Sequence, residues 1–246
     1  MKISIITCTW NSKPFLEQSI KSVLSQDYQN IEYIFVDGGS TDGTIERIAS
    51  INRPVMLLRD VGGGIAHAMN EGVRVATGDV IAHLHSDDYY LDGHVLTDIA
   101  NIFEKQQCGW LFGRIQSDID GQLISPTWLM PPFSLSRLEQ GNFIPHPATF
   151  IRRDLFIQTG GFDSSIKYAM DYDLWLRLSK ISSPLFVNRF IAAFRRHTGS
   201  LSTANPLPVL EEDYRVRMHH CTGGILKRLE HAARYIYRKS KVKYAG

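Results

Sequence analysis

The first ninety residues alternate between two kinds of segment. Short β-branched apolar runs, typical of buried strands, lie at residues 3–8, 31–36, 55–58 and 80–84. Between them, residues 14–26, 44–51 and 65–76 carry apolar side chains at helical spacing. Strands and helices that alternate in this way form right-handed crossovers and a mostly parallel sheet with helices on both faces. The sequence therefore predicts an α/β fold.

Polar residues follow each of these four strands. They occupy residues 7–12, 37–44, 59–64 and 85–88. In open α/β sheets, ligands bind in the crevice beyond the carboxyl ends of the strands. We therefore expect the four polar segments to converge on one ligand-binding rim.

The second half of the chain is less regular. We expect a hairpin from residues 110–115 and 122–124, a Pro-rich loop over 126–147, a strand at 148–151, a helix at 169–179 and one or two strands within 185–194. Neither a repeat nor a change of composition interrupts the chain before about residue 200. This organisation predicts a single domain, residues 1–205, with a C-terminal extension at residues 206–246.

The composition is that of an ordinary globular protein, with 43% hydrophobic and 21% charged residues. Three cysteines, about a hundred residues apart, offer neither a disulfide framework nor a C-x-x-C metal or redox motif. The chain has no run of 18 apolar residues, and the apolar stretch at 3–10 lacks the cleavage site of a signal peptide. We expect a protein of the reducing cytoplasm.

Two glycine-containing segments lie at strand ends. Residues 37–44 read Asp-Gly-Gly-Ser-Thr-Asp-Gly-Thr, so a ligand can approach the backbone closely and Asp37 can accept hydrogen bonds from a base or sugar. A helix cap with turn glycines explains the same residues equally well. The glycines at 62–64 lack both the G-x-G-x-x-G spacing and the Lys of a P-loop, which disfavours NAD-dependent and ATPase functions.

Two acidic pairs are candidates for chemistry. Asp87 and Asp88 follow a buried strand, where adjacent carboxylates repel one another unless solvent or a cation compensates them. Oxygen ligands of this kind suit Mg²⁺ or Mn²⁺, and an exposed acidic turn is the alternative. Asp171 and Asp173 begin a helix, where Asp171 could act as a general base or both aspartates could simply favour the helix N-terminus.

Eight short segments occur in a specific order: residues 7–11, 36–44, 68–72, 76–79, 86–88, 146–150, 160–163 and 171–177. This order strongly resembles family-2 glycosyltransferases with the GT-A fold, of the type that builds bacterial surface polysaccharides. The resemblance covers roughly residues 1–200. It implies a Rossmann-like, mostly parallel central sheet flanked by helices, with a nucleotide-sugar-binding half at 1–90 and an acceptor-binding half at 91–205.

The resemblance also implies a role for individual residues. Asp171 matches the catalytic base. The donor would be bound by Thr7, Asn11, Asp37, Ser40, Asn70 and Asp87, and a divalent Mn²⁺ or Mg²⁺ by Asp88 and His197. The acceptor would contact His146, Asp173, Arg177 and Trp128. Gly38, Ala66–His67 and His85 depart from the pattern of many relatives, which indicates a different donor sugar and leaves the nucleotide open.

Simpler interpretations exist for several of these residues. On the residues alone, His146 and His197 could be ordinary loop and surface histidines, and Arg177 could lie on a solvated helix face. Most of the tryptophans are expected to pack in the core. Trp128 in the Pro-rich loop is the best candidate for stacking on a sugar.

The C-terminal segment has its own charge pattern. Residues 227–246 hold seven Lys or Arg against one Glu, whereas the rest of the chain is slightly acidic. One apolar stripe of a helix would contain Ile225, Leu226, Leu229, Ala232, Ala233 and Ile236, and Lys227, His231, Arg234 and Arg238 recur on another face. Such a helix can lie on an anionic membrane surface, or it can pack on the domain with a solvated basic face. The acidic balance elsewhere argues against nucleic-acid binding.

The resulting hypothesis is an inverting, metal-dependent glycosyltransferase that uses a nucleotide-diphosphate sugar. Contact of residues 225–246 with the inner face of the plasma membrane would favour a polyprenyl-diphosphate-linked glycan acceptor, as in O-antigen or exopolysaccharide assembly. A sugar nucleotidyltransferase would need a Gly-rich basic segment near the first strand, where residues 7–13 offer one Lys and no Gly. A non-catalytic nucleotide-sugar or glycan-binding module is the third possibility.

Overall fold

The computed structural model describes residues 1–127, 130 and 132–244. Its N-terminal half is a parallel sheet in the order β3-β2-β1-β4. The strands are β1 (Ile3–Thr9), β2 (Ile31–Asp37), β3 (Met56–Leu58) and β4 (Val80–His83), and the helices between them are α1 (Lys13–Leu24), α2 (Thr44–Ala49) and α3 (Ile65–Val75). The predicted alternation of strand and helix is therefore confirmed.

The second half extends the same sheet with mixed directions. It adds β5 (Tyr89–Tyr90), β6 (Trp110–Ile119), β7 (Gln122–Ile124), β8 (Thr149–Arg152) and β9 (Leu185–Arg196). Strand β8 pairs antiparallel with both β4 and β6, whereas β9 runs parallel to β6. The α/β class is as predicted, but "mostly parallel" describes only the N-terminal half. A long connection precedes β8, and this strand enters the sheet in the reverse direction. The spacing of apolar residues within a strand does not indicate the direction in which the strand runs.

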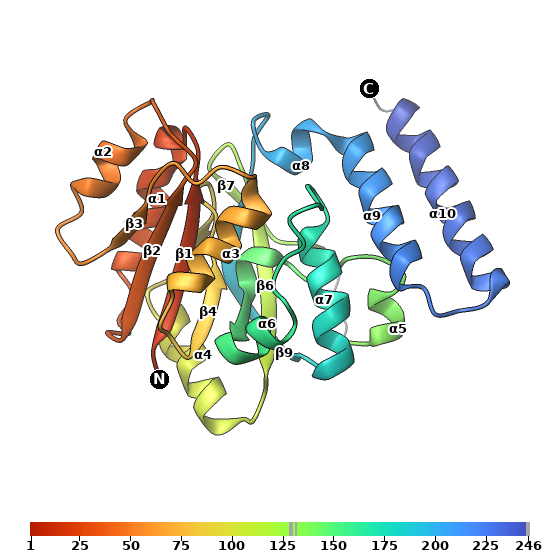
Figure 1. The fold of residues 1–246 in the computed structure, drawn as a ribbon, viewed down its shortest axis with the longest axis horizontal. Coiled ribbons are helices and arrows are strands. Elements are labelled where there is room, and N and C mark those ends of the chain that lie inside the picture. The colour runs from red at the N-terminus through yellow and green to blue at the C-terminus, as the bar shows by residue number, and fades with distance from the viewer. Residues whose placement is uncertain (128–129, 131, 245–246) are drawn as a thin grey trace.

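The strands of the first half are buried on both faces, so their apolar runs are nearly continuous. In β2, Ile34 and Val36 face the core cluster that also contains residues of α3, while Tyr33 and Phe35 face the cluster that contains residues of α1. Gly72 lets α3 approach β1 closely, because a Cβ at this position would meet Ile6 at 2.5 Å. Figure 1 shows helices on either side of the sheet.

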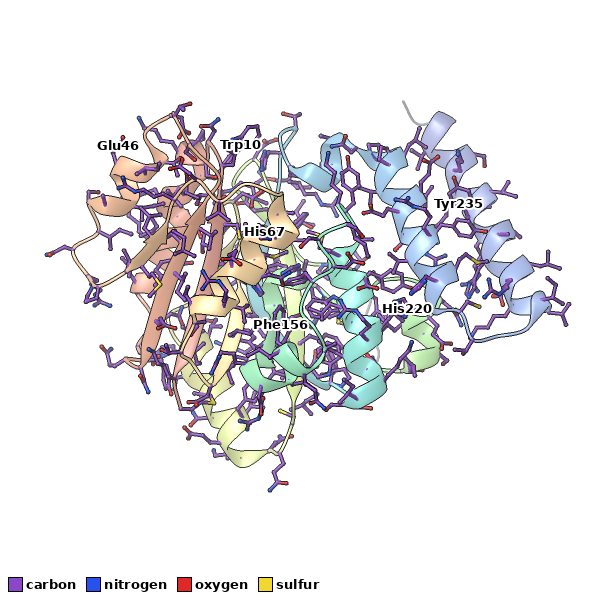
Figure 2. The ribbon with its side chains drawn as sticks, in the orientation of Figure 1. Trp10, Glu46, His67, Phe156, His220 and Tyr235 are labelled. Carbon is purple, nitrogen blue, oxygen red and sulfur yellow. The ribbon has the colours of Figure 1, made fainter. Side chains whose placement is uncertain are left out.

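The remaining elements lie mostly beside the second half of the sheet. They are α4 (Val95–Lys105), α5 (Leu135–Leu138), the 3₁₀ helix η1 (His146–Ala148), α6 (Arg153–Gln158), α7 (Met170–Ile181), α8 (Leu201–Ala204), α9 (Pro206–His220) and α10 (Ile225–Tyr244). Helix α9 packs on α7, and α10 packs on α9 at the edge of the molecule (Figure 1). The Tyr235 side chain of α10 stacks on Tyr214 of α9, with ring centroids 4.4 Å apart (Figure 2).

Helix α10 turns part of its basic face toward the domain and leaves its apolar stripe exposed. His231 is buried, and Lys227 pairs with Glu139 at 2.5 Å, so part of the basic face points toward the domain. Ile225, Leu226, Leu229 and Ile236 of the apolar stripe are instead 58–80% exposed. The helix is therefore packed on the domain, as one alternative expected, but its basic face is only partly solvated: Arg234 and Arg238 are exposed, whereas His231 is buried. None of the described helices is long and apolar enough to cross a membrane.

Candidate active site

The loops after β1 and β2 are joined by hydrogen bonds at the carboxyl end of the sheet. Thr9 Oγ1 donates to Asp37 Oδ2 at 2.7 Å. Asn11 follows β1 in the left-handed backbone region, with φ 48°, and its Oδ1 accepts a bond from Thr41 N at 2.9 Å. The Asn11 N–H donates to Ser40 Oγ at 2.8 Å. The first two predicted polar segments therefore form one continuous rim.

Asp37 organises this rim from a buried position. Its two oxygens accept bonds from the backbone of Gly39 and Ser40 and from the hydroxyls of Ser40 and Thr9. Burial by itself would raise the pKa of Asp37, but these hydrogen bonds outweigh it and hold the pKa below its ordinary value. Asp37 is thus a charged anchor for the loop, and its contact with a nucleotide base stays a prediction.

Two residues predicted to bind the donor are occupied elsewhere. Thr7 is fully buried, and its hydroxyl donates to Leu84 O at 2.7 Å, so it joins β1 to the segment after β4. Asn70 lies on α3 and makes two bonds to Phe162, with Nδ2 2.8 Å from the carbonyl oxygen and Oδ1 2.9 Å from the amide nitrogen. Both residues therefore hold parts of the fold in position, Thr7 from a buried strand and Asn70 through its two bonds to Phe162. Their contact with the donor stays a prediction.

Asp87 and Asp88 meet the end of β9 at the same rim. Asp87 Oδ2 lies 3.0 Å from His197 Nε2, and Asp88 Oδ1 accepts a bond from the Arg195 backbone at 3.1 Å. Asp88 is buried, and this burial together with the neighbouring Asp87 charge raises its pKa well above the ordinary value. The structure therefore places a buried carboxyl, a second carboxyl and an imidazole together, as the sequence predicted.

This donor set fits a divalent cation that shares its coordination with a ligand. Within the described part of the chain, no group of three or more His, Cys, Asp or Glu is arranged to hold a metal ion by itself. Mg²⁺ and Mn²⁺, however, are commonly held by one or two carboxylates and substrate phosphates. The buried Asp88 carboxyl has one backbone donor and an acidic neighbour, so a cation would relieve the repulsion between Asp87 and Asp88.

Asp171 lies in the first turn of α7 and is partly buried. Its Oδ2 accepts a bond from Asn142 Nδ2 at 3.1 Å and lies 4.0 Å from His146 Nδ1. Burial raises the pKa of Asp171 to about 6, although hydrogen bonds from Tyr172 N and Asn142 act in the opposite direction. The side chain keeps 18% of its surface exposed. Its carboxylate is therefore accessible, and its pKa suits a general base near neutral pH.

Three histidines connect the Asp87 rim to Asp171. The His146 ring lies 4.9 Å from that of His85 and 5.7 Å from that of His83, measured between centroids. Burial, together with the neighbouring His85 charge, lowers the pKa of His83 to about 3, and burial with both neighbours lowers that of His146. Because His85 precedes Ser86 and Asp87, this aromatic contact brings the two acidic centres to the same end of the sheet.

Asp173 and Arg177, predicted to contact an acceptor, instead form an internal network. Asp173 accepts bonds from Arg177 Nε at 2.8 Å and makes a 2.7 Å contact with His220 Nε2, which faces α7 from the end of α9 (Figure 2). Arg177 also donates to the carbonyl oxygens of Thr159 and Gly161, each at 2.7 Å. The charged groups of both residues are thus bonded to each other, to His220 and to backbone, and their contact with an acceptor stays a prediction. Trp128 lies outside the described residues.

Two polar residues near Asp171 escaped the sequence analysis. Asn142 lies in the expected Pro-rich loop, where its bond to Asp171 depends on how that loop folds back. Glu212 of α9 accepts backbone bonds from Lys167, Tyr168 and Ala169 just before α7. Its carboxylate satisfies donors at the N-terminus of the helix that carries Asp171. Neither residue belongs to a local motif that could have indicated its role.

Comparison with solved structures gives the class of fold, which is that of GT-A glycosyltransferases. Among solved structures, S. aureus TarS 1–349 in complex with UDP-GlcNAc has a TM-score of 0.74 at 18% identity, covering 96% of this chain and 72% of that one. The mannosyltransferase PcManGT from Pyrobaculum calidifontis, in complex with GDP-Man and Mn²⁺, has a TM-score of 0.69 at 16% identity, covering 95% and 69%.

Sequence comparison gives the family. Residues 4–160 match the family model for glycosyl transferase family 2. An uncharacterized glycosyltransferase of Rickettsia typhi is 30% identical over 85% of this chain and 68% of its own length. The chain belongs to glycosyl transferase family 2.

Proposed function

We propose that this protein transfers one sugar from a nucleotide-diphosphate sugar to a glycan acceptor, with inversion at the anomeric carbon. The observation that carries the proposal is the placement of Asp171 near the Asp87–Asp88 rim. The His85–His146 ring contact links the two centres, and Asp171 Oδ2 lies 4.0 Å from His146 Nδ1. A donor bound at the rim would therefore share this end of the sheet with an accessible carboxylate.

Asp171 supplies the base for a single displacement. Its carboxylate takes the proton of the acceptor hydroxyl while that oxygen forms a bond to the anomeric carbon. The bond from the anomeric carbon to the diphosphate breaks at the same time, and its electron pair leaves with the nucleoside diphosphate. Attack from the face opposite the leaving group inverts the anomeric configuration. The pKa of Asp171 near 6 keeps most of the carboxyl ionised at neutral pH.

The rim residues would position the donor. Asn11, Asp37 and Ser40 line the strand ends where the nucleotide is expected, and Asp87 would lie near the ribose and sugar. Asp88 and His197, together with the donor diphosphate, would hold Mn²⁺ or Mg²⁺, which when bound offsets negative charge on the departing diphosphate. The Mn²⁺ complex of PcManGT, which shares the fold, supports testing this metal first.

The acceptor we propose is a lipid-linked glycan in O-antigen or exopolysaccharide assembly. The support is α10, whose exposed apolar stripe is accompanied by exposed basic residues such as Arg228 and Lys241. Such a surface suits a peripheral position on an anionic membrane at the inner face of the plasma membrane. In this proposal residues 1–205 carry the chemistry, and residues 206–246 attach it to the surface where the acceptor lies.

A thermal-shift screen tests the donor. The full chain would be heated with UDP-, GDP-, dTDP- or CMP-sugars, each with Mn²⁺, Mg²⁺ or EDTA, because a ligand that binds the native state raises its apparent stability. A shift with one nucleotide class, followed by transfer to an acceptor, is the expected result. Release of diphosphate from a sugar phosphate and a nucleoside triphosphate would favour a nucleotidyltransferase. Donor binding without transfer to any acceptor would favour a binding module.

A further inference from the structure

A basic cavity adjoins Asp171 between α5, α9 and α10. Its volume is about 360 Å³, within the range of small-molecule sites. It is lined by Arg137, Gln140, Gly141, Asn142, Phe143, Arg217, Arg234, Tyr237 and Arg238. Three segments far apart in the sequence thus contribute four guanidinium groups to one space, whereas no carboxylate lines it.

The charges around the cavity are not balanced by the protein. Arg217 pairs with Asp213, and Arg234 with Glu230 at 2.9 Å. Arg137 and Arg238 have no carboxylate within ion-pair distance among the described residues. An excess of two positive charges remains, and guanidinium groups do not lose their protons to relieve it. A bound anion with two or more charges would do so.

One of these groups also has an unused donor inside the protein. Arg217 is 3% exposed, and its Nε has no hydrogen-bond partner. A buried polar atom without a partner is uncommon and calls for an explanation such as a bound water or ion. The planar guanidinium fork matches the oxygens of phosphate, and four such groups suit a phosphate or diphosphate better than a single carboxylate.

The cavity and the base share one residue. Asn142 lines the cavity and donates from Nδ2 to Asp171 Oδ2 at 3.1 Å. Asn142 therefore lies between the cavity and the Asp171 carboxylate, and a ligand held in the cavity by its anionic group would reach Asp171 only with a part that extends past Asn142. The outer wall of the cavity is formed by Arg234, Tyr237 and Arg238 of α10, the helix whose other face carries the exposed apolar stripe.

We infer that this cavity is the acceptor subsite for a phosphate or diphosphate group, which anchors the acceptor so that its hydroxyl reaches Asp171. The inference rests on the proposed glycosyltransferase function and deepens it, because it assigns the acceptor to the class of glycosyl phosphates. Arg137 and Arg238 are the residues that discriminate this class, since both are exposed, line the cavity and form no close ion pair among the described residues, although the charge of Asp213 acts on Arg238.

Calorimetric titration of the full chain with geranyl diphosphate, inorganic diphosphate and geraniol tests the inference. EDTA is present throughout, so that the Asp87–Asp88 rim cannot bind diphosphate through a metal. The variant R137Q/R238Q is compared with R53Q/R74Q, which removes two exposed arginines from the α2–β3 connection and from α3. We expect geranyl diphosphate to bind the wild type, geraniol not to bind, and the Kd to rise at least about tenfold only in R137Q/R238Q.

Tighter binding of geranyl diphosphate than of inorganic diphosphate would support a lipid-linked acceptor, and equal binding would support recognition of the phosphate group alone. An unchanged Kd in R137Q/R238Q, or binding of neither diphosphate by the wild type, would overturn the inference. Thermal shifts with nucleotide sugars and Mn²⁺ are measured on the same variants. Their absence in the wild type would count against the proposed function, while intact donor shifts without diphosphate binding would remove only the cavity assignment.

Discussion

His197 lies 110 residues beyond Asp87 in the chain, yet its Nε2 is 3.0 Å from the Asp87 Oδ2 atom. The contact exists because β9 runs to Arg196 beside β6, and its end reaches the loop that follows β4. The His197 ring also packs against Phe15 of α1, with centroids 4.3 Å apart. The rim at the strand ends of the N-terminal half is thus completed by a residue from the second half of the chain.

Replacing Asp171 with Asn should abolish transfer without weakening donor binding. Asn cannot take the acceptor proton, and a positioned general base contributes about 10²- to 10⁴-fold to the rate. Steady-state kinetics with the donor found by thermal shift would measure the loss in kcat, and calorimetry would measure the donor Kd. Transfer at the wild-type rate by D171N would refute the role of Asp171 as base.

The pH profile of transfer should follow the Asp171 carboxyl. Burial raises its pKa to about 6, and only the ionised form accepts a proton, so kcat/KM should fall about tenfold per unit of pH below that value. The Asn142 hydrogen bond lowers this pKa, so Asn142→Ala should move the acidic limb to higher pH. Rate measurements from pH 4.5 to 8 would show both effects. A limb that stays in place in N142A would assign the titration to another group.

Asp88→Asn should remove metal-dependent donor binding. The substitution keeps the shape of the buried side chain but removes its negative charge, which a divalent cation requires. In a thermal-shift experiment the wild type should respond to the nucleotide sugar with Mn²⁺ more strongly than with EDTA, whereas D88N should respond equally in both. A metal-dependent shift that survives in D88N would show that the cation is held elsewhere.

Asp173→Ala should lower the free energy of unfolding rather than act on the transfer reaction. The change leaves Arg177 and His220 without their shared carboxylate, and breaking a buried ion pair from one side costs about 3–5 kcal/mol. Urea unfolding followed by fluorescence would measure the free energy of unfolding. Asp154→Ala, at an exposed position in the first turn of α6, is the control and should cost less than about 1 kcal/mol. Equal losses of unfolding free energy in both variants would contradict a stabilising role for the Asp173–Arg177–His220 network.

Membrane contact should depend on the exposed stripe of α10. The wild type is expected to sediment with vesicles rich in phosphatidylglycerol, and L226S/L229S/I236S should stay in the supernatant, since apolar burial and basic charge act together at an anionic surface. The control I157S/I181S removes two exposed apolar side chains from α6 and α7 and should bind like the wild type. Vesicle binding that persists in the triple variant would place the contact on another surface.

Local patterns were sufficient for the first half of the fold and for the identity of the acidic residues. The apolar runs and helical spacing of residues 3–84 correspond to β1–β4 and α1–α3 with small shifts at the ends. The segment carrying Asp87 and Asp88 lies at the sheet end as expected. The directions of the strands in the second half could not be predicted, because β8 and β9 pair with strands many residues away in the chain.

The roles of single polar residues depended on their partners. Asp171 and Asp173 look alike in the sequence, two positions apart on one helix. Their side chains point in different directions, so Asp171 has an exposed edge beside His146, whereas Asp173 is enclosed by Arg177 and His220. The internal bonds of Thr7 and Asn70 could not be predicted for the same reason, since a hydroxyl or an amide reveals no partner until the chain has folded.

The sequence by itself determined the α/β class, the acidic rim after β4 and the helix that begins near Asp171, because periodicity and turn chemistry act over a few neighbouring residues. Only the tertiary structure decided which carboxylates are free for chemistry, which face of α10 meets solvent, and that four arginines from three segments enclose one cavity. These properties arise from contacts between distant parts of the chain, whose geometry is set by packing of the whole sheet and its helices.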